Sequence, residues 1–418
     1  MNLHAPLPAN DHTQARNIDL AAEIDRCVLC GMCSQHCPTY AIRADENESP
    51  RGRIALIAAL AAKQIAADTT MQAHLRHCTG CRACEASCPS GVRFGAIMDA
   101  ARAMLPRQDP PSLPSQQHIR WLRLYQRTGL QHLARASGLL KPLGLAQKDN
   151  LLPPIPDTPS WQAYYPATPG AEPRGDVALF TGCIANTFDR KALEASRHLL
   201  NTLGYGVHVP PGQDCCGALA LHNGRPDEAT QLARQNLETF AKLDVQAIVH
   251  TASGCSATLS EYHRQLPGTE TFSRKVKDIS QFLAEVEWPA AVAIAPLPKT
   301  IALHTPCSLQ NVLRQAEAPR RLLQRIPRLE IVPLAPNTRC CGGAGRYMLE
   351  QADFAQGLRA KTLDAFARVQ AQQEIDTLIT SNLGCALHLA AGLRERGQDV
   401  EVVHPVVLLA RQVEALRA

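Results

Sequence analysis

Two stretches of the chain each carry four cysteines, and the spacing is the same in both. The first reads CVLCGMCSQHCP, from Cys27 to Pro38, and the second reads CTGCRACEASCP, from Cys78 to Pro89. Both follow C-x2-C-x2-C-x3-C-P, in which three closely spaced thiolates bind one cubane [4Fe–4S] cluster and the fourth is directed away from it. The spacing therefore predicts two clusters that exchange their fourth ligands.

Each predicted cluster takes three thiolates from one stretch and one from the other. We expect one cluster on Cys27, Cys30, Cys33 and Cys88, and the second on Cys78, Cys81, Cys84 and Cys37. Zinc and disulfide bonds are the alternatives for closely spaced cysteines. A tetrahedral zinc site needs no further cysteine before a proline, and the pattern occurs twice, so iron–sulfur clusters are the favoured interpretation.

The composition indicates a multidomain chain rich in metal ligands. It has 418 residues, 16 cysteines and a formal net charge of +5, and two or three domains are expected from this length. The first 17 residues do not resemble a signal peptide, so we expect a cytoplasmic location without a disulfide framework. No run of apolar residues predicts a membrane span. The mild charge argues against nucleic acid as a partner.

The two stretches belong to a first region, residues 1–105, that is expected to be helical. Helices are predicted over 19–25, 49–77 and 92–105, and Ser49 with Pro50 suits a helix start. Arg51 and Arg53 follow directly. They could lie beside a cluster and tune its potential, but a solvated helix start is the favoured interpretation. His36 and His77, next to the predicted ligands, are interpreted as ordinary residues because the thiolate count is complete.

Residues 106–173 contain 12 of the 30 prolines and are predicted to form a linker. One amphipathic helix is expected within 119–144, where Trp121 and several leucines alternate with arginines. Such a helix can lie on an anionic membrane or in the groove of a partner. Packing against its own protein is the favoured alternative.

The rest of the chain is an internal repeat. VALFTGC at 177–183 matches IALHTPC at 301–307, DCCG at 214–217 matches RCCG at 339–342, and AIVHTASGC at 247–255 matches TLITSNLGC at 377–385. Continuous apolar runs that alternate with helical segments predict parallel sheets in two α/β units, residues 174–292 and 293–418. The predicted fold class is therefore α+β multidomain, with a helical first domain followed by two repeated α/β domains.

Each repeat places four cysteines just past its strand ends. They are Cys183, Cys215, Cys216 and Cys255 in the first repeat, and Cys307, Cys340, Cys341 and Cys385 in the second. Because the carboxyl ends of parallel strands meet in one crevice, one or two further clusters are predicted there. The alternative is that these cysteines are small buried apolar side chains. His250 and His304, at strand ends, are interpreted as packing residues, with contact to a proton or a quinone as the alternative.

Together these features resemble the iron–sulfur subunit of glycolate oxidase, and are similar to those of lactate and glycerol-3-phosphate dehydrogenases and to heterodisulfide reductase. The resemblance rests on the paired cysteine stretches, on SPRGRI at 49–54 and on the two CCG repeats, and it covers the chain from about residue 20. It implies a ferredoxin-like domain, two CCG domains and an electron-transfer subunit of an oxidoreductase complex. A partner subunit carrying FAD would oxidise a 2-hydroxy acid, and electrons would pass to quinone at the inner face of the cell membrane.

The chain departs from the heterodisulfide reductase pattern at the end of both repeats. There C-x-x-C is expected, whereas this chain has Cys255 followed by Ser-Ala-Thr and Cys385 followed by Ala-Leu-His. The missing cysteine argues against a five-thiolate cluster and against a disulfide-cleaving site. His388 stands at the second vacant position, and a packing residue on a helix is the favoured interpretation.

The sequence offers no site for an organic cofactor. CGGAGRY at 341–347 follows the cysteine pair and lacks the G-x-G-x-x-G spacing. Removing hydride from an alcohol carbon requires such a cofactor. We therefore assign no catalytic residue to this chain and expect the chemistry of the hydroxy acid on the partner.

Overall fold

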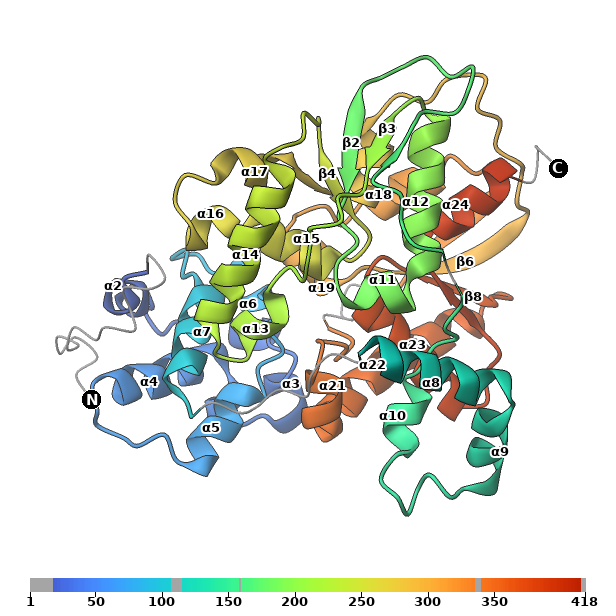
Figure 1. The fold of residues 1–418 in the computed structure, drawn as a ribbon. Helices are drawn as coiled ribbons and strands as arrows, with labels where there is room; N and C mark the ends of the chain where they lie inside the picture. Colours follow the sequence, from blue (N-terminus) through green and yellow to red (C-terminus); the bar gives the residue numbers. More distant parts are fainter. Residues whose placement is uncertain (1–17, 107–114, 158, 335–339, 415–418) are drawn as a thin grey trace.

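The structure, a computed structural model, describes residues 18–106, 115–157, 159–334 and 340–414. A helical module, blue in Figure 1, lies beside two α/β repeats, coloured green to yellow and orange to red. No described helix is both long and apolar enough to cross a lipid bilayer.

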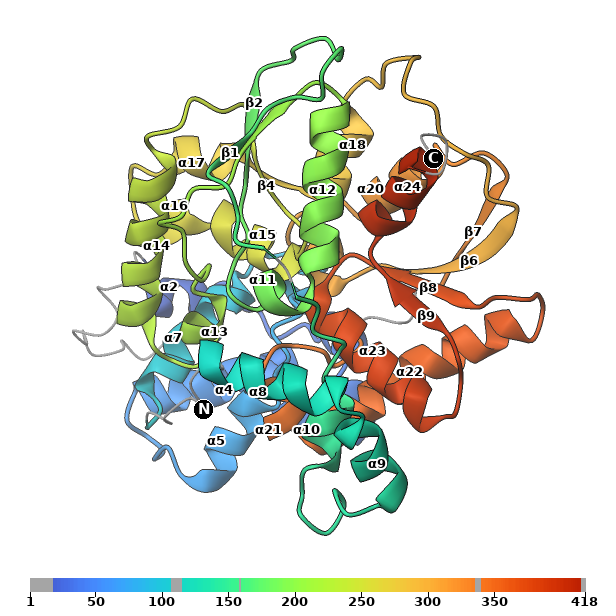
Figure 2. The same ribbon diagram turned by 45° about the vertical axis from the view of Figure 1, so that its right-hand side comes forward.

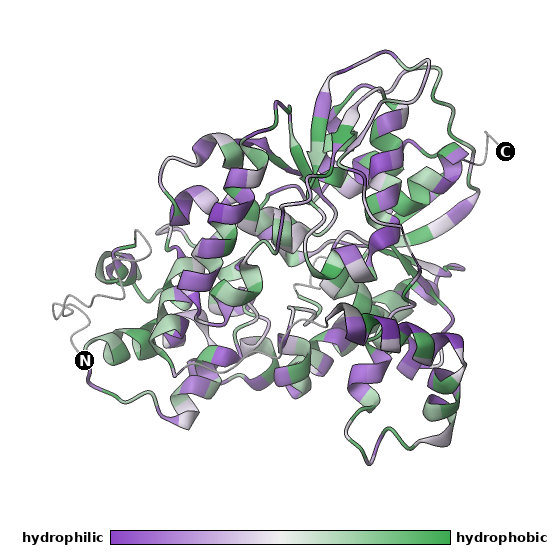
Figure 3. Cartoon of the chain, in the orientation of Figure 1, coloured by the Kyte–Doolittle hydropathy of each residue, from purple (hydrophilic) through white to green (hydrophobic). Residues whose placement is uncertain are grey.

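The helical module consists of short helices around one apolar core. They are α2 (Leu20–Asp25), η1 (Ser34–His36), α3 (Tyr40–Arg43), η2 (Glu46–Glu48), α4 (Pro50–Ala61), α5 (Thr69–Arg76), α6 (Ala83–Ala86) and α7 (Phe94–Met104). The predicted start of α4 is confirmed, because Ser49 Oγ accepts a hydrogen bond from the backbone N–H of Gly52 at 3.0 Å. Helix α4 is largely hydrophobic (Figure 3) and buries Ile57 against Leu75 and Ile97.

The helix predicted over 49–77 is in fact two helices. Helix α4 ends at Ala61, Lys63 follows with φ +56°, and α5 begins after Asp68. Asp68 caps α5 by accepting a hydrogen bond from the N–H of Met71 at 2.8 Å. A second helix therefore begins at this N-cap. The spacing of Ala and Leu in the sequence did not indicate this break between two helices.

The amphipathic segment also divides in two. Helices α8 (Gln116–Arg127) and α9 (Leu130–Ser137) are separated by Gly129 at φ +76°, and α10 (Ala146–Asn150) follows. Trp121 and Leu133 are 64% and 63% exposed. Ile119 of α8, in contrast, is 4% exposed, so the segment packs on the chain through part of its surface and leaves these two side chains exposed.

The two repeats contain matching parallel sheets. The first has the order β1-β3-β2-β4-β5 and the second β7-β6-β8-β9, and among the described strands only the pair β1 and β3 is antiparallel. The strands are β1 (Tyr164–Tyr165), β2 (Asp176–Leu179), β3 (Gly206–His208), β4 (Ile248–His250), β5 (Val276–Asp278), β6 (Lys299–His304), β7 (Leu329–Pro333), β8 (Thr377–Thr380) and β9 (Glu401–Val403). The predicted strands are found, and with them the predicted fold class is confirmed.

Helices cover both sheets and join them. The first repeat has α11 (Ile184–Phe188), α12 (Arg190–Thr202), α13 (Ala218–His222), α14 (Pro226–Phe240), α15 (Ser253–Ser260), α16 (Tyr262–Gln265), α17 (Glu270–Lys275) and α18 (Ile279–Glu285). The second has α19 (Cys307–Asn311), α20 (Ala318–Leu323), α21 (Tyr347–Glu350), α22 (Ala352–Gln370), α23 (Leu383–Glu395) and α24 (Pro405–Glu414). Helix α12 packs on α24 and α18 on α20 (Figure 2). One apolar core therefore runs through both repeats.

Polar contacts tie the helical module to the repeats. Arg82 Nη1 lies 2.7 Å from Glu261 Oε2 in the first repeat. In the second, Asn311 donates to the carbonyl of Cys81 at 2.8 Å, and the Tyr347 hydroxyl donates to the carbonyl of His77 at 2.9 Å. These contacts place the second cysteine stretch beside the strand ends of the repeats.

Candidate metal centres

The first predicted set of ligands meets near the surface of the helical module. Cys27, Cys30, Cys33 and Cys88 line one cavity of about 30 Å³. Cys30 is exposed and the other three are partly buried. Arg51 lies over the loop, where its Nη1 donates to the carbonyl of Leu29 at 3.3 Å. We call these four cysteines the outer site.

Both cysteine stretches wrap their backbone in the same way. In the first, Leu29 and Gly31 have φ +56° and +80°, and in the second, Gly80 and Arg82 have φ +69° and +56°. These residues occupy equivalent positions, immediately before and after the second cysteine. A left-handed conformation at Leu29 and Arg82 costs about 1–3 kcal/mol each and persists only where the surrounding structure imposes it. This shared loop conformation fits the binding of a cluster by three thiolates.

The second set lies deep between the module and the repeats. Cys37, Cys81 and Cys84 are buried and Cys78 is partly buried. Burial raises the pKa of Cys84 well above its ordinary value, and the neighbouring Cys81, Cys78 and Cys37 raise it further. Thiolates are the ligands of metals, and buried ones require a compensating positive charge. We call these four cysteines the inner site, and its donors also fit a metal cluster.

The cysteines of the two repeats form matching groups. In the first, the Cys183 thiol donates to Cys215 Sγ at 3.4 Å, and the N–H of Gly217 donates to the same sulfur at 3.5 Å. In the second, the N–H of Gly342 donates to Cys340 Sγ at 3.4 Å. The φ angle of Gly342 is +80°, and a Cβ there would lie 2.6 Å from the carbonyl oxygen of Ala355. Glycine is thus required for the helix α22 backbone to approach.

The remaining cysteines complete both groups at the strand ends. A hydrogen bond with Cys216 lowers the pKa of Cys255, although burial opposes this effect. Cys307 and Cys385 contact Cys340 and Cys341 in the second repeat. One cavity of about 1300 Å³ is lined by all eight cysteines of the repeats and by Cys78 of the inner site. None of the sixteen cysteines, all of which lie in the described residues, forms a disulfide bond.

Three protein-family models match successive parts of the chain. The model of the 4Fe-4S dicluster domain matches residues 23–92. The model of the glycolate oxidase iron-sulfur subunit linker region matches residues 118–152. The model of the cysteine-rich domain matches residues 177–260 and 301–390.

Some similar proteins match almost the whole chain, and others match about half of it. The probable glycolate oxidase iron-sulfur subunit of Bacillus subtilis is 34% identical over 93% of each chain. The chain belongs to the family of glycolate oxidase iron–sulfur subunits. The glycolate oxidase iron-sulfur subunit of Escherichia coli is 29% identical over 91% of this chain and 93% of its own length. Lactate utilization protein A of a Geobacillus species is 28% identical over 54% of this chain and 96% of its own length.

In this glycolate oxidase subunit homologue, the two arginines of SPRGRI serve different sites. Arg51 is partly exposed, and its Nε donates to Glu46 Oε1 at 2.6 Å. Arg53 is 1% exposed, and its Nη1 lies 3.8 Å from Cys37 Sγ at the inner site. The interpretation of Arg53 as part of a solvated helix start is wrong, because the first turn of α4 faces the inner site on this side.

Arg53 belongs to a buried polar network. Its guanidinium forms an ion pair with Glu48 and donates to Thr39 Oγ1 at 3.1 Å and to the carbonyl of His74 at 2.8 Å. Glu48 Oε1 accepts hydrogen bonds from Nδ1 of His74 and His77 at 2.8 and 2.6 Å. Sequence reasoning missed Glu48 and His74, because no spacing rule connects them to the cysteines. The position of Glu48 directly before SPRGRI was the one sign in the sequence that a carboxylate could pair with these arginines.

Proposed function

We propose that the chain is the electron-transfer subunit of a flavin-dependent 2-hydroxy-acid dehydrogenase of the glycolate oxidase type. Cys27, Cys30, Cys33 and Cys88 would hold one [4Fe–4S] cluster at the outer site, and Cys37, Cys78, Cys81 and Cys84 a second at the inner site. The eight cysteines of the CCG repeats would hold one or two more. When bound, such clusters accept and donate single electrons.

The continuity of the cysteine groups carries this proposal. Cys84 of the inner site also lines the cavity of the outer site. Cys81 packs in one apolar cluster with Cys340 and Cys307 of the second repeat. The groups thus form an unbroken series from the exposed Cys30 to the repeats, as an electron relay requires.

The outer site offers a surface for the flavin-binding partner. Val28 and Met32, on either side of Cys30, are 70% and 50% exposed. Exposed apolar residues that surround a functional group are typical of a docking surface. A partner that covers them would bring its reduced flavin next to the outer site.

Helices α8 and α9 offer a surface for a membrane that contains the quinone acceptor. Trp121, Leu124, Leu130 and Leu133 are all exposed along these helices. Arg123 and Arg127 both pair with Asp157, so apolar contact contributes more than charge. In Figure 1, helix α2, which directly precedes the outer site, lies at the left edge of the molecule and α9 at the lower right. We therefore infer peripheral attachment at the inner face of the cell membrane, away from the flavin partner.

The test is anaerobic purification of the chain alone and together with its flavoprotein partner. About eight irons per chain would mean that the outer and inner sites alone are loaded, and twelve or sixteen that the repeats are loaded too. The isolated chain is expected not to oxidise glycolate with an artificial acceptor, whereas the complex reduces a soluble quinone. Substantial turnover by the chain alone would overturn the division of labour.

The substrate of the partner is a separate question within this proposal. The similarity to lactate utilization protein A favours lactate as the second candidate. Assays of the complex with glycolate, lactate and glycerol 3-phosphate would distinguish them, and glycolate is expected to give the highest kcat/KM. A disulfide-reductase assay with a chemical electron donor tests the remaining alternative in the CCG crevice.

A further inference from the structure

The two CCG repeats differ at the strand ends that face their cysteines. Strand β2 of the first repeat leads to Phe180, and β6 of the second ends at the corresponding His304. Strand β4 ends at His250, and β8 ends at the corresponding Thr380. On these two pairs of strands each repeat therefore has one histidine, and the two histidines lie on strands that do not correspond.

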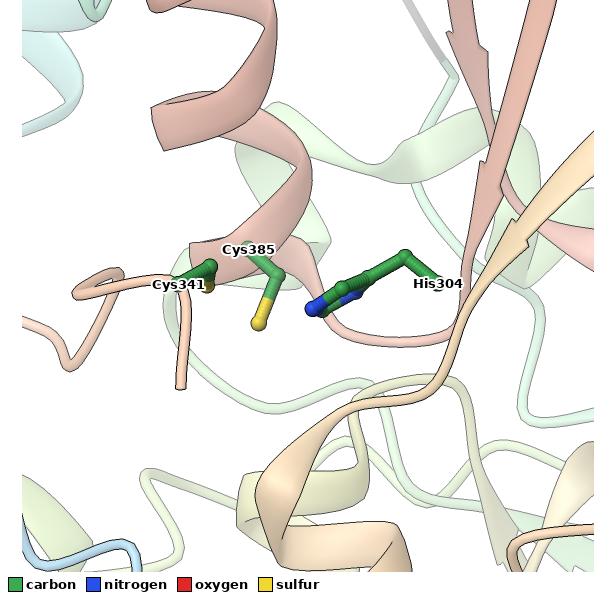
Figure 4. Close-up of side chains that lie close together, drawn as sticks. All are labelled: His304, Cys341 and Cys385. Carbon is green, nitrogen blue, oxygen red and sulfur yellow. The ribbon is translucent and has the colours of Figure 1, made fainter. Parts of the chain in front are cut away.

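In the second repeat the histidine lies among the cysteines. One ligand atom each of His304, Cys341 and Cys385 lie within 4.8 Å of one another, and all three residues are buried. Figure 4 shows the ring of His304 directed toward the sulfur of Cys385. The Nδ1 atom is 3.0 Å from Oγ1 of Thr380, its neighbour on β8. Nε2 is then the nitrogen that remains for a metal.

In the first repeat the histidine lies on the other strand, and its ring is also oriented by a hydrogen bond at Nδ1. Nδ1 of His250 is 2.6 Å from the carbonyl oxygen of Phe180. A carbonyl only accepts, so Nδ1 carries the hydrogen and Nε2 of the neutral ring has a free lone pair. His250 is completely buried, Nε2 has no hydrogen-bond partner among the described residues, and the ring lies beside Cys255.

We propose that His304 and His250 bind metal through Nε2, so that the centre of each CCG repeat has a mixed imidazole and thiolate ligand set. Donor atoms of one metal ion lie within about 4–5 Å of one another, because each metal–ligand bond measures about 2.0–2.3 Å. The hydrogen bonds at Nδ1 are of the kind that orients metal-binding histidines and fixes the tautomer. This inference rests on the proposed iron–sulfur function and goes beyond its thiolate ligands.

The exchange of strands explains why comparison of the repeats did not reveal the ligands. Aligned positions pair His304 with Phe180 and His250 with Thr380. In the parallel sheets, however, β2 lies next to β4 and β6 next to β8. A side chain at either strand end can therefore reach the same group of cysteines. A neutral imidazole in place of a thiolate also raises the reduction potential of an iron–sulfur centre.

The test uses the full chain, grown with ¹⁵N-histidine, purified anaerobically and reduced. Pulsed electron paramagnetic resonance is expected to detect nitrogen bound directly to iron. His304→Ala and His250→Ala should each remove about half of this coupling, and the double variant all of it. His388→Gln is the matched control. His388 is also buried and donates from Nε2 to the carbonyl of Ala355, but the charged groups that act on its ring are Arg359 and Glu395 and no cysteine. The variant should leave the coupling unchanged.

A further variant separates ligation from folding. His304→Cys supplies a thiolate at the same place, so it should retain iron but lose the nitrogen coupling of the second repeat. Iron in the repeats without any histidine coupling, coupling that survives in the double variant, or repeats without iron would each overturn the inference. Reducible outer and inner clusters in the same sample would then show that the proposed electron-transfer function still stands.

Discussion

The outer and inner sites have the same motif but opposite surroundings. The outer site includes the exposed Cys30 and lies beside Arg51, whose partner Glu46 is half exposed. The inner site lies beside Arg53, whose partner Glu48 is buried. An exposed cation is screened by water, whereas a buried one acts at full strength on a nearby charge. We therefore expect the charge at position 53 to affect the inner cluster more than the charge at position 51 affects the outer one.

The largest expected effect tests whether the two sites exchange their fourth ligand. Cys88→Ala should remove the outer cluster and leave the inner one, although Cys88 belongs to the second stretch. Cys37→Ala should do the reverse. Iron analysis should fall from about eight to about four atoms per helical module in either variant. Spectra that assign each loss to the cluster nearest in sequence would contradict the exchange.

The next effect is on stability. Arg53→Met would leave the Glu48 carboxylate buried without its cation, which costs about 3–5 kcal/mol. Arg51→Met removes a half-exposed pair and should cost roughly 0.2–1 kcal/mol. Denaturant unfolding of the two variants, followed by circular dichroism, measures both values. If the two variants lost equal amounts of unfolding free energy, burial would not be what makes the Arg53 ion pair the stronger one.

The same two variants test how each arginine affects the reduction potential of the cluster beside it. Loss of a buried positive charge disfavours the reduced cluster, so Arg53→Met should lower the potential of the inner cluster by at least about 59 mV, a tenfold change in its one-electron equilibrium. The outer cluster should change less in this variant. Arg53→Lys keeps the charge and should restore most of the potential. Redox titration followed by electron paramagnetic resonance gives both values, and an unchanged inner potential would refute the assigned role of Arg53.

The smallest effect is on the acid side of the stability profile. Burial alone would raise the pKa of Glu48, but the hydrogen bond from His77 and the charge of Arg53 outweigh it and hold the pKa below its ordinary value of 4.5. The stability due to this ionised group is complete above pH 4.5 and is lost as the pH falls through the folded-state pKa.

Glu48→Gln should therefore flatten the dependence of the unfolding free energy on pH below 4.5. Glu46→Gln is the matched control, because hydrogen bonding to Arg51 also lowers the pKa of Glu46 but leaves the group half exposed. Unfolding at several pH values between 3 and 6 measures both slopes. If Glu46→Gln changed the pH dependence of the unfolding free energy more than Glu48→Gln, the conclusion that the buried carboxylate contributes more stability would be wrong.

Much of the architecture was predictable from the sequence. The cysteine spacing indicated the two motifs, and the repeated apolar runs indicated parallel strands that the structure contains as β2, β4, β6 and β8. These features depend on residues that are close in the chain, so local geometry and the hydrophobic pattern are sufficient. The division of α4 from α5 and of α8 from α9 was missed, because short breaks over residues 62–68 and 128–129 interrupt segments whose apolar residues otherwise follow a helical pattern.

The amino-acid sequence by itself thus determined the type and spacing of the thiolates, the repeat and the family. Only the tertiary structure decided which neighbours each site has. Arg51 and Arg53 stand in the same helical turn, but residues two apart on a helix face different directions and meet different surroundings. His250 and His304 lie at the ends of strands that do not correspond in the two repeats. Such environments depend on segments that are far apart in the chain, and no local pattern records their approach.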